Sequence, residues 1–306
     1  MNKKYVIITP AYNEQENIES VIKGVIAQTV HPVKWIIVDD GSTDRTLDIA
    51  RRYEKSYSFL ECHSRKRSNK QSYYASNVYA ILSGYDKIKD LDFDYVAILD
   101  ADIELCDNYY QEIFKRFDLN PDLGIAAGTY LEEICGKISE ANIDRQSTPK
   151  AIQVFRTKCY QQIGGYIPFK NGGEDSCTEV MARMVGWQTW SFPEIKVIHR
   201  KPVGTAQGNS ILHGRYGLGL TDYCLGAHPL FMLAKCLRRC VLEKPYLTSG
   251  ICRLAGYLSG YLKAEPRQIP RHARDYLRKE QLKRLKAAMT LKMQPWSPVS
   301  PLDPEE

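Results

Sequence analysis

The sequence predicts an α/β protein with a central, mostly parallel sheet flanked by helices, followed by a helical C-terminal extension. Short apolar runs typical of buried strands alternate with segments of helical periodicity over the first hundred residues. Clusters of polar residues follow three of these runs directly. At 306 residues, the chain is also long enough to bury a substantial core without disulfides.

The N-terminal part of the chain contains two strand and helix units. The apolar runs at 5–9 and 34–38 have the length and composition of strands. Residues 14–27 have the apolar spacing of an amphipathic helix, and a second helix is expected from about 44 to 53. A weaker strand at 59–62 begins the next unit.

A helix at about 72–83 leads to the apolar run 95–99, which reads as a strand buried on both faces. Asp100 and Asp102 follow this run with one residue between them. Alternate residues of an extended chain point to the same side, so the two carboxylates are expected to face one space. Two hard oxygen ligands predict a divalent cation that holds a diphosphate, although such a motif also occurs in solvated turns.

Polar clusters end the first, second and fourth predicted strands, at 9–14, 39–43 and 100–102. The carboxyl ends of parallel strands meet at one edge of a sheet, where ligands bind in this class of fold. We therefore expect these clusters to form one site. Residues 129–150 are polar and lack a motif, which predicts an acceptor loop or an exposed excursion.

An ordered set of motifs resembles the family 2 glycosyltransferases, whose catalytic domain has the GT-A (Rossmann-like) fold. The resemblance covers about residues 4–204 and implies a GT-A domain at 1–204. It also implies a metal-dependent, inverting transfer of a sugar from a nucleotide diphosphate sugar to a hydroxyl. The motifs are Thr-Pro-Ala-Tyr-Asn-Glu at 9–14, Val-Asp-Asp-Gly-Ser-Thr-Asp at 38–44, Asp-Ala-Asp at 100–102, Gly-Gly-Glu-Asp at 172–175 and Val-Ile-His-Arg at 197–200.

The resemblance implies a nucleotide pocket. Tyr12 offers a base a stacking face, and Asp40 accepts a hydrogen bond from a base N–H. Both residues also fit ordinary turn positions. Asn77 stands where the family often has an asparagine, followed here by Val78 in place of the usual glycine. The full set of implied nucleotide-binding residues is Thr9, Pro10, Ala11, Tyr12, Glu14, Asp40, Asn77, Asp100 and Ala101.

The resemblance also implies a metal site for Mg²⁺ or Mn²⁺. Asp102 is the expected direct ligand, and Asp100 shares the cation or binds ribose hydroxyls. His199 occupies the position from which family members often complete the site, although a histidine after a strand is also an ordinary core or surface residue. The cation would act as a Lewis acid and offset charge on the leaving nucleoside diphosphate.

Glu174 and Asp175 begin a segment of helical periodicity after two glycines. Acidic residues in a first helical turn are favoured by the helix dipole, so capping alone would explain them. The resemblance implies catalysis, with Asp175 as the base that deprotonates the acceptor hydroxyl and Glu174 orienting the acceptor or the loop. Glu179 and Arg183 are spaced to pair along this helix and brace it.

The net charge of +6 is unevenly distributed. Residues 235–293 contain fifteen Lys or Arg and four Asp or Glu, a balance of +11, so the rest of the chain sums to 6 − 11 = −5. Such a surplus suits an anionic membrane surface or a solvated helical face. Nucleic acid is not an expected partner, because no recognised module accompanies the basic residues.

We expect residues 205–294 to form a mainly helical extension and the proline-rich residues 295–306 to be disordered. Residues 204–219 are glycine-rich and predict a flap over the donor or a linker. One or two helices are expected at 228–262. An amphipathic basic helix, which packs on the domain, pairs with another subunit or lies on a membrane, is indicated by Leu282, Leu285, Met289 and Met293.

Cysteine usage and the first residues favour a cytoplasmic protein, with attachment to the inner face of the membrane left open. The nine cysteines include no C-x-x-C pair, which argues against a disulfide framework or a zinc site. The first residues lack the apolar region and cleavage site of a signal peptide. The uncharged stretch 223–234 is too short to cross a bilayer.

The family and the basic tail together suggest that the acceptor is a saccharide or lipid-linked saccharide in cell-surface polysaccharide biosynthesis. Two alternatives remain at this point. A non-catalytic nucleotide-sugar-binding or scaffold protein would keep Asp40 without needing Asp102 or Asp175. A nucleotidyltransferase would need a glycine-rich basic loop after the first strand, and residues 10–16 do not provide one.

Overall fold

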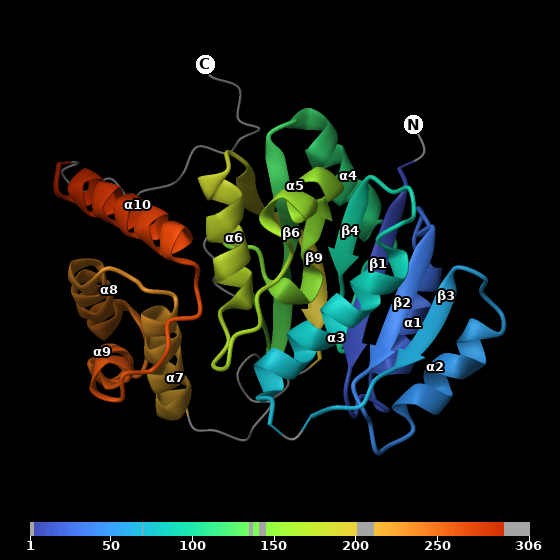
Figure 1. Cartoon of the computed structure of the whole chain (residues 1–306), viewed down its shortest axis with the longest axis horizontal. Helices are drawn as coiled ribbons and strands as arrows, with labels where there is room; N and C mark the ends of the chain where they lie inside the picture. The colour runs from blue at the N-terminus through green and yellow to red at the C-terminus, as the bar shows by residue number, and fades with distance from the viewer. Residues whose placement is uncertain (1–2, 69, 135–136, 141–144, 201–210, 291–306) are drawn as a thin grey trace.

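The computed structural model describes residues 3–68, 70–134, 137–140, 145–200 and 211–290 (Figure 1). Within these ranges the strands form one sheet in the order β3-β2-β1-β4-β8-β6-β9-β5, with β7 paired to β6. The strands are β1 Tyr5–Ala11, β2 Lys34–Asp39, β3 Leu60–Ser64, β4 Tyr95–Ile98, β5 Ile103–Glu104, β6 Leu123–Ile134, β7 Lys137–Glu140, β8 Val154–Arg156 and β9 Gln188–His199.

Helices cover both faces of the sheet, and four more follow it (Figure 1). Those of the sheet layer are α1 Ile18–Ile26, α2 Thr46–Glu54, α3 Tyr73–Ile88, α4 Tyr109–Leu119, the 3₁₀ turn η1 Lys150–Ile152, α5 Thr157–Ile163 and α6 Glu174–Met184. Those of the extension are α7 Ile211–Cys224, α8 Pro229–Leu242, α9 Thr248–Leu262 and α10 Arg271–Thr290.

The predicted α/β class is confirmed by the strand directions. β1 is the centre of a parallel group, since Ile8 pairs in register with Ile36 of β2 and Ile98 of β4, and β3 extends the group beyond β2. β8 runs antiparallel between β4 and β6, while β6 and β9 are parallel to each other. The carboxyl ends of β1, β2, β3 and β4 consequently meet at one edge.

Strand alternation creates two cores, one on each face of the sheet. Tyr5 and Ile7 of β1 pack with apolar side chains of α1, α2 and α4, whereas Val6 and Ile8 pack with those of α3, α5 and α6. All four side chains are fully buried. The second core continues into α7–α10, so the sheet layer and the C-terminal helices share one apolar interior.

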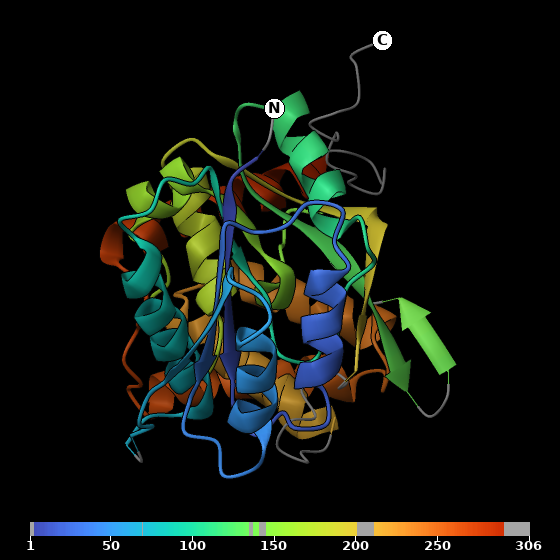
Figure 2. The same ribbon diagram turned by 90° about the vertical axis from the view of Figure 1, so that its right-hand side faces the viewer.

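Part of the polar segment 129–150, expected to be an acceptor loop or an exposed excursion, forms strands. β6 continues to Ile134 and turns into β7, with Leu131 opposite Glu140, and this hairpin projects from the body in Figure 2. β6 also pairs with β9 from Leu123 to Glu132. Backbone hydrogen bonds on both sides therefore extend a strand whose side chains give little periodic signal. Residues 141–144 lie outside the described ranges.

The C-terminal helices pack closely on one another and on α6. A Cβ atom on Gly219 of α7 would lie 1.9 Å from the Arg253 carbonyl oxygen of α9, so this contact requires glycine. Arg183 of α6 binds Glu280 of α10, with Nε 2.9 Å from Oε1. Leu282 and Leu285 of the expected amphipathic helix lie in α10, whose Glu280 contacts α6, while Met293 lies outside the described residues.

Two expectations for the C-terminal region fall wholly or partly outside the described ranges. The expected disordered tail at 295–306 is one, and residues 204–210 of the expected flap or linker are the other. The rest of that segment begins α7 at Ile211. Among the described residues, no helix is long and apolar enough to span a membrane.

Candidate functional site

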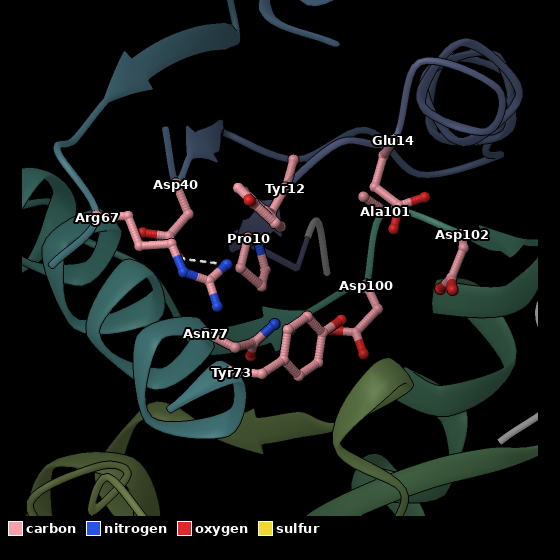
Figure 3. A pocket seen from close by; sticks show the side chains of 11 residues that line it. Pro10, Tyr12, Glu14, Asp40, Arg67, Tyr73, Asn77, Asp100, Ala101 and Asp102 are labelled. Atoms are coloured by element: carbon pink, nitrogen blue, oxygen red, sulfur yellow. Dashed lines mark ion pairs between the residues drawn. The ribbon is translucent and has the colours of Figure 1, made fainter. Parts of the chain in front are cut away.

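A pocket opens at the carboxyl ends of β1, β2 and β4, beside the first turns of α3 (Figure 3). It contains every sequence-predicted nucleotide-binding residue except Thr9, together with Asp102, and it adds two residues that the sequence did not indicate. The lining residues are Pro10, Ala11, Tyr12, Glu14, Asp40, Arg67, Tyr73, Asn77, Asp100, Ala101 and Asp102.

Thr9 differs from the expectation, because its side chain is fully buried beneath the pocket. The indole N–H of Trp35 donates a hydrogen bond to Thr9 Oγ1 at 3.0 Å. Strand alternation places Thr9 on the same face of β1 as Tyr5 and Ile7, which is a core face. Its side chain supports the pocket floor and does not line it.

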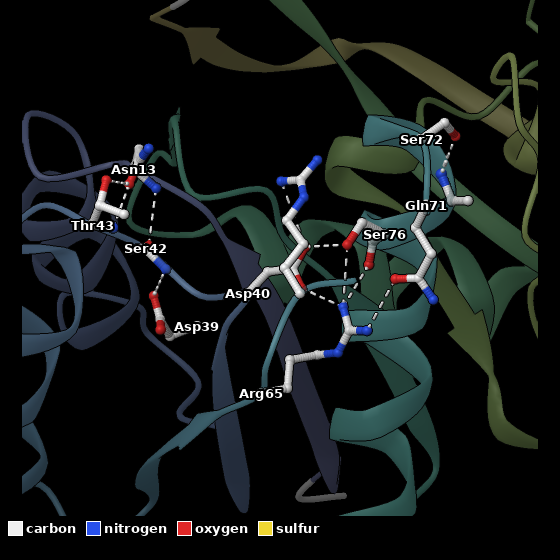
Figure 4. Close-up of polar contacts among 11 residues, drawn as sticks. Asn13, Asp39, Asp40, Ser42, Thr43, Arg65, Gln71, Ser72 and Ser76 are labelled. Atoms are coloured by element: carbon white, nitrogen blue, oxygen red, sulfur yellow. Dashed lines mark hydrogen bonds and ion pairs between the residues drawn. The ribbon is translucent and has the colours of Figure 1, made fainter. Parts of the chain in front are cut away.

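Asp40 is held by a network of hydrogen bonds and ion pairs at the end of β2 (Figure 4). Ser76 Oγ donates to one carboxylate oxygen at 2.6 Å, and Arg65 binds the other. Burial raises the pKa of Asp40 above its ordinary value, although Ser76 and the two arginines Arg65 and Arg67 oppose this effect. The carboxylate therefore has a fixed orientation at the pocket wall.

Arg67 places a guanidinium beside the aromatic wall of the pocket. Its Cζ lies 4.2 Å from the ring centroid of Tyr12 and 5.7 Å from that of Tyr73. It also approaches Asp40, at 3.8 Å. The attraction between the guanidinium and the two aromatic rings favours this arrangement of the three side chains. The basic run 65–67 directly after β3 is the sequence signal that could have indicated this residue.

Lys150, in η1, was not predicted and contacts two residues of the pocket lining, Asp100 and Asn77. Its ammonium lies 2.8 and 3.0 Å from the two carboxylate oxygens of Asp100 and 3.0 Å from Asn77 Oδ1. Burial would lower the pKa of Lys150, but the charges of Asp100 and Glu174 raise it above its ordinary value. Lys150 is thus a buried cation within electrostatic reach of both acidic motifs.

Asp102 and His199, the two outer residues of the expected metal site, lie close together. Ile103 of β5 pairs with His199 of β9, and this pairing leaves Asp102 Oδ1 3.4 Å from His199 Nε2. Mg²⁺ and Mn²⁺ commonly take one or two protein ligands and complete their shell with substrate phosphates and water. This pair fits such a cation. No group of three metal-binding side chains occurs among the described residues, and Asp100 is engaged by Lys150.

Glu174 and Asp175 form the first turn of α6, after Gly173 at φ 103°. Asp175 accepts a hydrogen bond from the backbone N–H of Ser176 at 2.7 Å. Glu174 is buried, and its Oε2 has no hydrogen-bond partner among the residues the structure describes. Burial and the Asp175 charge raise the pKa of Glu174 to about 7, and burial also raises that of Asp175.

The expected brace between Glu179 and Arg183 is replaced by two longer-range contacts. Glu179 accepts hydrogen bonds from the Thr148 backbone N–H and from Thr148 Oγ1, the latter at 3.0 Å. Arg183 instead forms the ion pair with Glu280. Burial and the Asp175 charge raise the pKa of Glu179 to about 8. Glu179 therefore fastens the segment that precedes Lys150 to α6.

Comparison with known proteins matches residues 6–184 to the family model described as glycosyl transferase family 2. The uncharacterized glycosyltransferase YibD of Escherichia coli is 28% identical over 123 residues, which cover 40% of this chain and 33% of that protein. Poly-beta-1,6-N-acetyl-D-glucosamine synthase of Staphylococcus epidermidis is 28% identical over 117 residues, or 38% of this chain and 26% of that protein. The match thus spans a third or less of these relatives.

A solved structure has a similar fold over nearly the whole chain. It is a mannosyltransferase of Pyrobaculum calidifontis in complex with GDP-Man and Mn²⁺. The TM-score is 0.57 at 16% identity, and the alignment covers 94% of this chain and 87% of that one. This likeness shows the fold.

Proposed function

This chain belongs to glycosyl transferase family 2, and we propose that it transfers a sugar from a nucleotide diphosphate sugar to a hydroxyl with inversion of configuration. One observation carries the proposal: a single pocket contains the aromatic and acidic residues suited to a nucleotide and, at its rim, a carboxylate next to a histidine. Glu174 belongs to a second acidic pair, with Asp175. Its charge acts on Lys150, which contacts Asp100 of the pocket. The following steps assign a role to each group.

The nucleoside is proposed to bind between Tyr12 and Asp40. The Tyr12 ring, held by Arg67, gives the base an apolar and polarisable surface. Asp40 accepts a hydrogen bond from the base N–H through lone pairs that Ser76 and Arg65 leave available, because a carboxylate has about four acceptor positions. Asn77 and Asp100 line the same pocket beyond the base and are assigned to the ribose.

The diphosphate is proposed to bind beside Asp102, His199 and Lys150. Asp102 and His199 would hold Mg²⁺ or Mn²⁺, which supplies Lewis-acid stabilisation of the leaving diphosphate. Lys150 carries a charge that suits the same oxygens, and its contact with Asp100 fixes its position in the absence of donor. The mannosyltransferase of similar fold was solved with Mn²⁺, which supports a metal here.

Asp175 is proposed as the general base. It accepts the proton of the acceptor hydroxyl while that oxygen bonds to the anomeric carbon, and the bond from this carbon to the diphosphate oxygen breaks on the opposite side. Its partial exposure leaves it accessible to an acceptor, whereas Glu174 is buried behind it. Glu174 positions the loop and, when ionised, makes Asp175 a stronger base through like-charge repulsion.

The acceptor is proposed to be a saccharide or a lipid-linked saccharide, within cell-surface polysaccharide assembly. The similarity to a poly-beta-1,6-N-acetyl-D-glucosamine synthase supports a saccharide acceptor. Glu132 of β6 pairs with His199 of β9, so the β6–β7 hairpin begins beside this proposed metal ligand. This hairpin is a candidate acceptor-binding element.

Donor binding tests the proposal directly. UDP-, GDP- and dTDP-sugars are screened by calorimetry with Mn²⁺ and with EDTA, using the parent, Asp102→Ala and the control Asp90→Ala. Asp90 is exposed and follows the far end of α3. We expect one nucleotide class to bind with Mn²⁺, and Asp102→Ala to weaken it at least about tenfold without loss of folding. Equal binding by Asp102→Ala would refute the metal assignment.

A further inference from the structure

The helices α8 and α9 expose apolar side chains that the proposed transferase chemistry does not use. On α8, Leu230, Leu233, Leu237 and Val241 are 61%, 47%, 61% and 71% exposed. Their spacing of three, four and four residues places them on one face of the helix. On α9, Ile251, Leu258 and Leu262 form a second stripe and are 60%, 49% and 87% exposed.

The opposite faces of both helices are buried, so the stripes face outward. Met232 and Cys236 of α8 are buried, and a Cβ on Gly250 of α9 would lie 2.3 Å from the Cys236 carbonyl oxygen. The turn between the helices adds Tyr246 and Leu247, which are 55% and 64% exposed. We call these two stripes and this turn the α8–α9 face. An exposed apolar surface of this extent marks an interaction site.

The charges around the α8–α9 face are mostly positive. Residues 229–264 contain six Lys or Arg and a single acidic residue, Glu243, which pairs with Arg215 and Arg239. Three of the basic side chains are exposed beside the apolar stripes: Arg238, Lys244 and Lys263. Tyr246 lies near the Lys244 ammonium, 6.0 Å from it to the ring centroid. Apolar stripes with flanking cations are typical of helices that lie in a membrane interface.

We propose that the α8–α9 face docks on an anionic lipid bilayer, with both helices lying in the plane of the headgroups. The basic rim complements anionic headgroups. A second copy is the poorer occupant, because a two-fold interface through this face would place Arg238, Lys244 and Lys263 against cations of the same set. The proposal does not depend on the transferase activity, since it concerns a different surface.

The first half of α10 is fastened to the catalytic domain. In α10, Ala273 and Leu277 are buried in the core shared with α6, and Glu280 binds Arg183. Removing α10 would therefore expose this core instead of releasing a surface anchor. The test needs substitutions of exposed side chains that leave the packing of the helices intact.

The full chain is sedimented with vesicles of phosphatidylcholine and phosphatidylglycerol, and with phosphatidylcholine alone. We expect binding to the anionic vesicles that weakens as salt is raised, because cations and headgroups are screened. Leu237→Ser with Leu262→Ser should lower the affinity at least about tenfold, through loss of apolar insertion. Arg238→Gln with Lys244→Gln and Lys263→Gln should reduce it by a similar factor and flatten the salt dependence.

Leu119→Ser is the matched control, because Leu119 is 66% exposed on α4 and lies outside the α8–α9 face. It should bind vesicles as the parent does. Donor binding by every variant reports that the domain remains folded, and sedimentation equilibrium reports the oligomeric state. Vesicle binding unchanged in both multiple variants would overturn the proposal. So would a parent that ignores anionic vesicles, or a parent dimer that the leucine variant converts to a monomer.

Discussion

Replacing Glu179 with glutamine should remove a pH-dependent contribution to the stability of the fold. Glu179 is 4% exposed and accepts two hydrogen bonds from Thr148, and its pKa is raised from 4.5 to about 8. The folded protein therefore retains a proton that the unfolded chain releases at lower pH. This protonation stabilises the fold fully below about pH 4.5, and the contribution is lost as the pH rises through about 8.

The magnitude is set by the pKa difference of about 3.5 units, at roughly 1.4 kcal/mol per unit. The parent should thus lose up to about 5 kcal/mol of unfolding free energy at this site between pH 4.5 and 9. Glutamine keeps the oxygen that accepts from Thr148 and has no proton to release. The variant should exceed the parent by about 1 kcal/mol at pH 5.5, where the unfolded parent is already mostly ionised, and by several kcal/mol at pH 9.

Urea unfolding monitored by tryptophan fluorescence at pH 5.5, 7 and 9 measures this difference. Glu174 and all other titrating groups are common to both proteins, so the comparison isolates Glu179. Glu16→Gln is the control, because Glu16 is exposed, and it should follow the parent at every pH. Equal pH dependence of the parent and Glu179→Gln would refute the reasoning.

Two predictions concern the proposed chemistry. Asp175→Asn should bind donor with the parent's affinity but lose transfer by roughly 10²-fold or more, because the base is removed. Initial rates measure this loss, and NMR of the parent's product should show the inverted anomer. Near-parental activity of Asp175→Asn would mean that another residue is the base. Lys150→Met should weaken a nucleoside diphosphate at least about tenfold while changing the corresponding nucleoside far less, since its charge serves the phosphates. Calorimetry measures the affinity for both ligands. An equal loss of affinity for the nucleoside and the nucleoside diphosphate would contradict a role of Lys150 in phosphate binding.

The sequence was sufficient for the sheet edge and most of the pocket, because strong local signals mark these features. The apolar run before Asp100 identifies a buried strand, and the polar clusters after parallel strands must converge. The face of the sheet on which a single side chain lies is harder to predict from the sequence. Thr9 lies within a motif, yet strand alternation turns its side chain to Trp35. Val78, which replaces a glycine usual in the family, is fully buried in the core and lies outside the pocket lining.

Other site residues could not be found because tertiary contacts alone bring them in. Lys150 follows a stretch without periodicity and reaches Asp100 only because the next strand, β8, pairs with β4. For the C-terminal helices, the sequence pattern likewise could not tell which apolar face is covered. Ala273 and Leu277 of α10 are buried in the core shared with α6, whereas Leu233 and Leu237 of α8 are exposed. Periodicity predicts an amphipathic helix, but packing decides whether its apolar face is covered.

Release of nucleoside diphosphate from the donor identified in the binding screen tests the central proposal most directly. Chromatography follows the release with acceptor and Mn²⁺ for the parent, Asp102→Ala and Asp175→Asn. We predict turnover by the parent, weak donor binding by Asp102→Ala, and parental binding without turnover by Asp175→Asn. Parental turnover by Asp175→Asn, or metal-independent turnover by Asp102→Ala, would contradict the assignment of these two carboxylates.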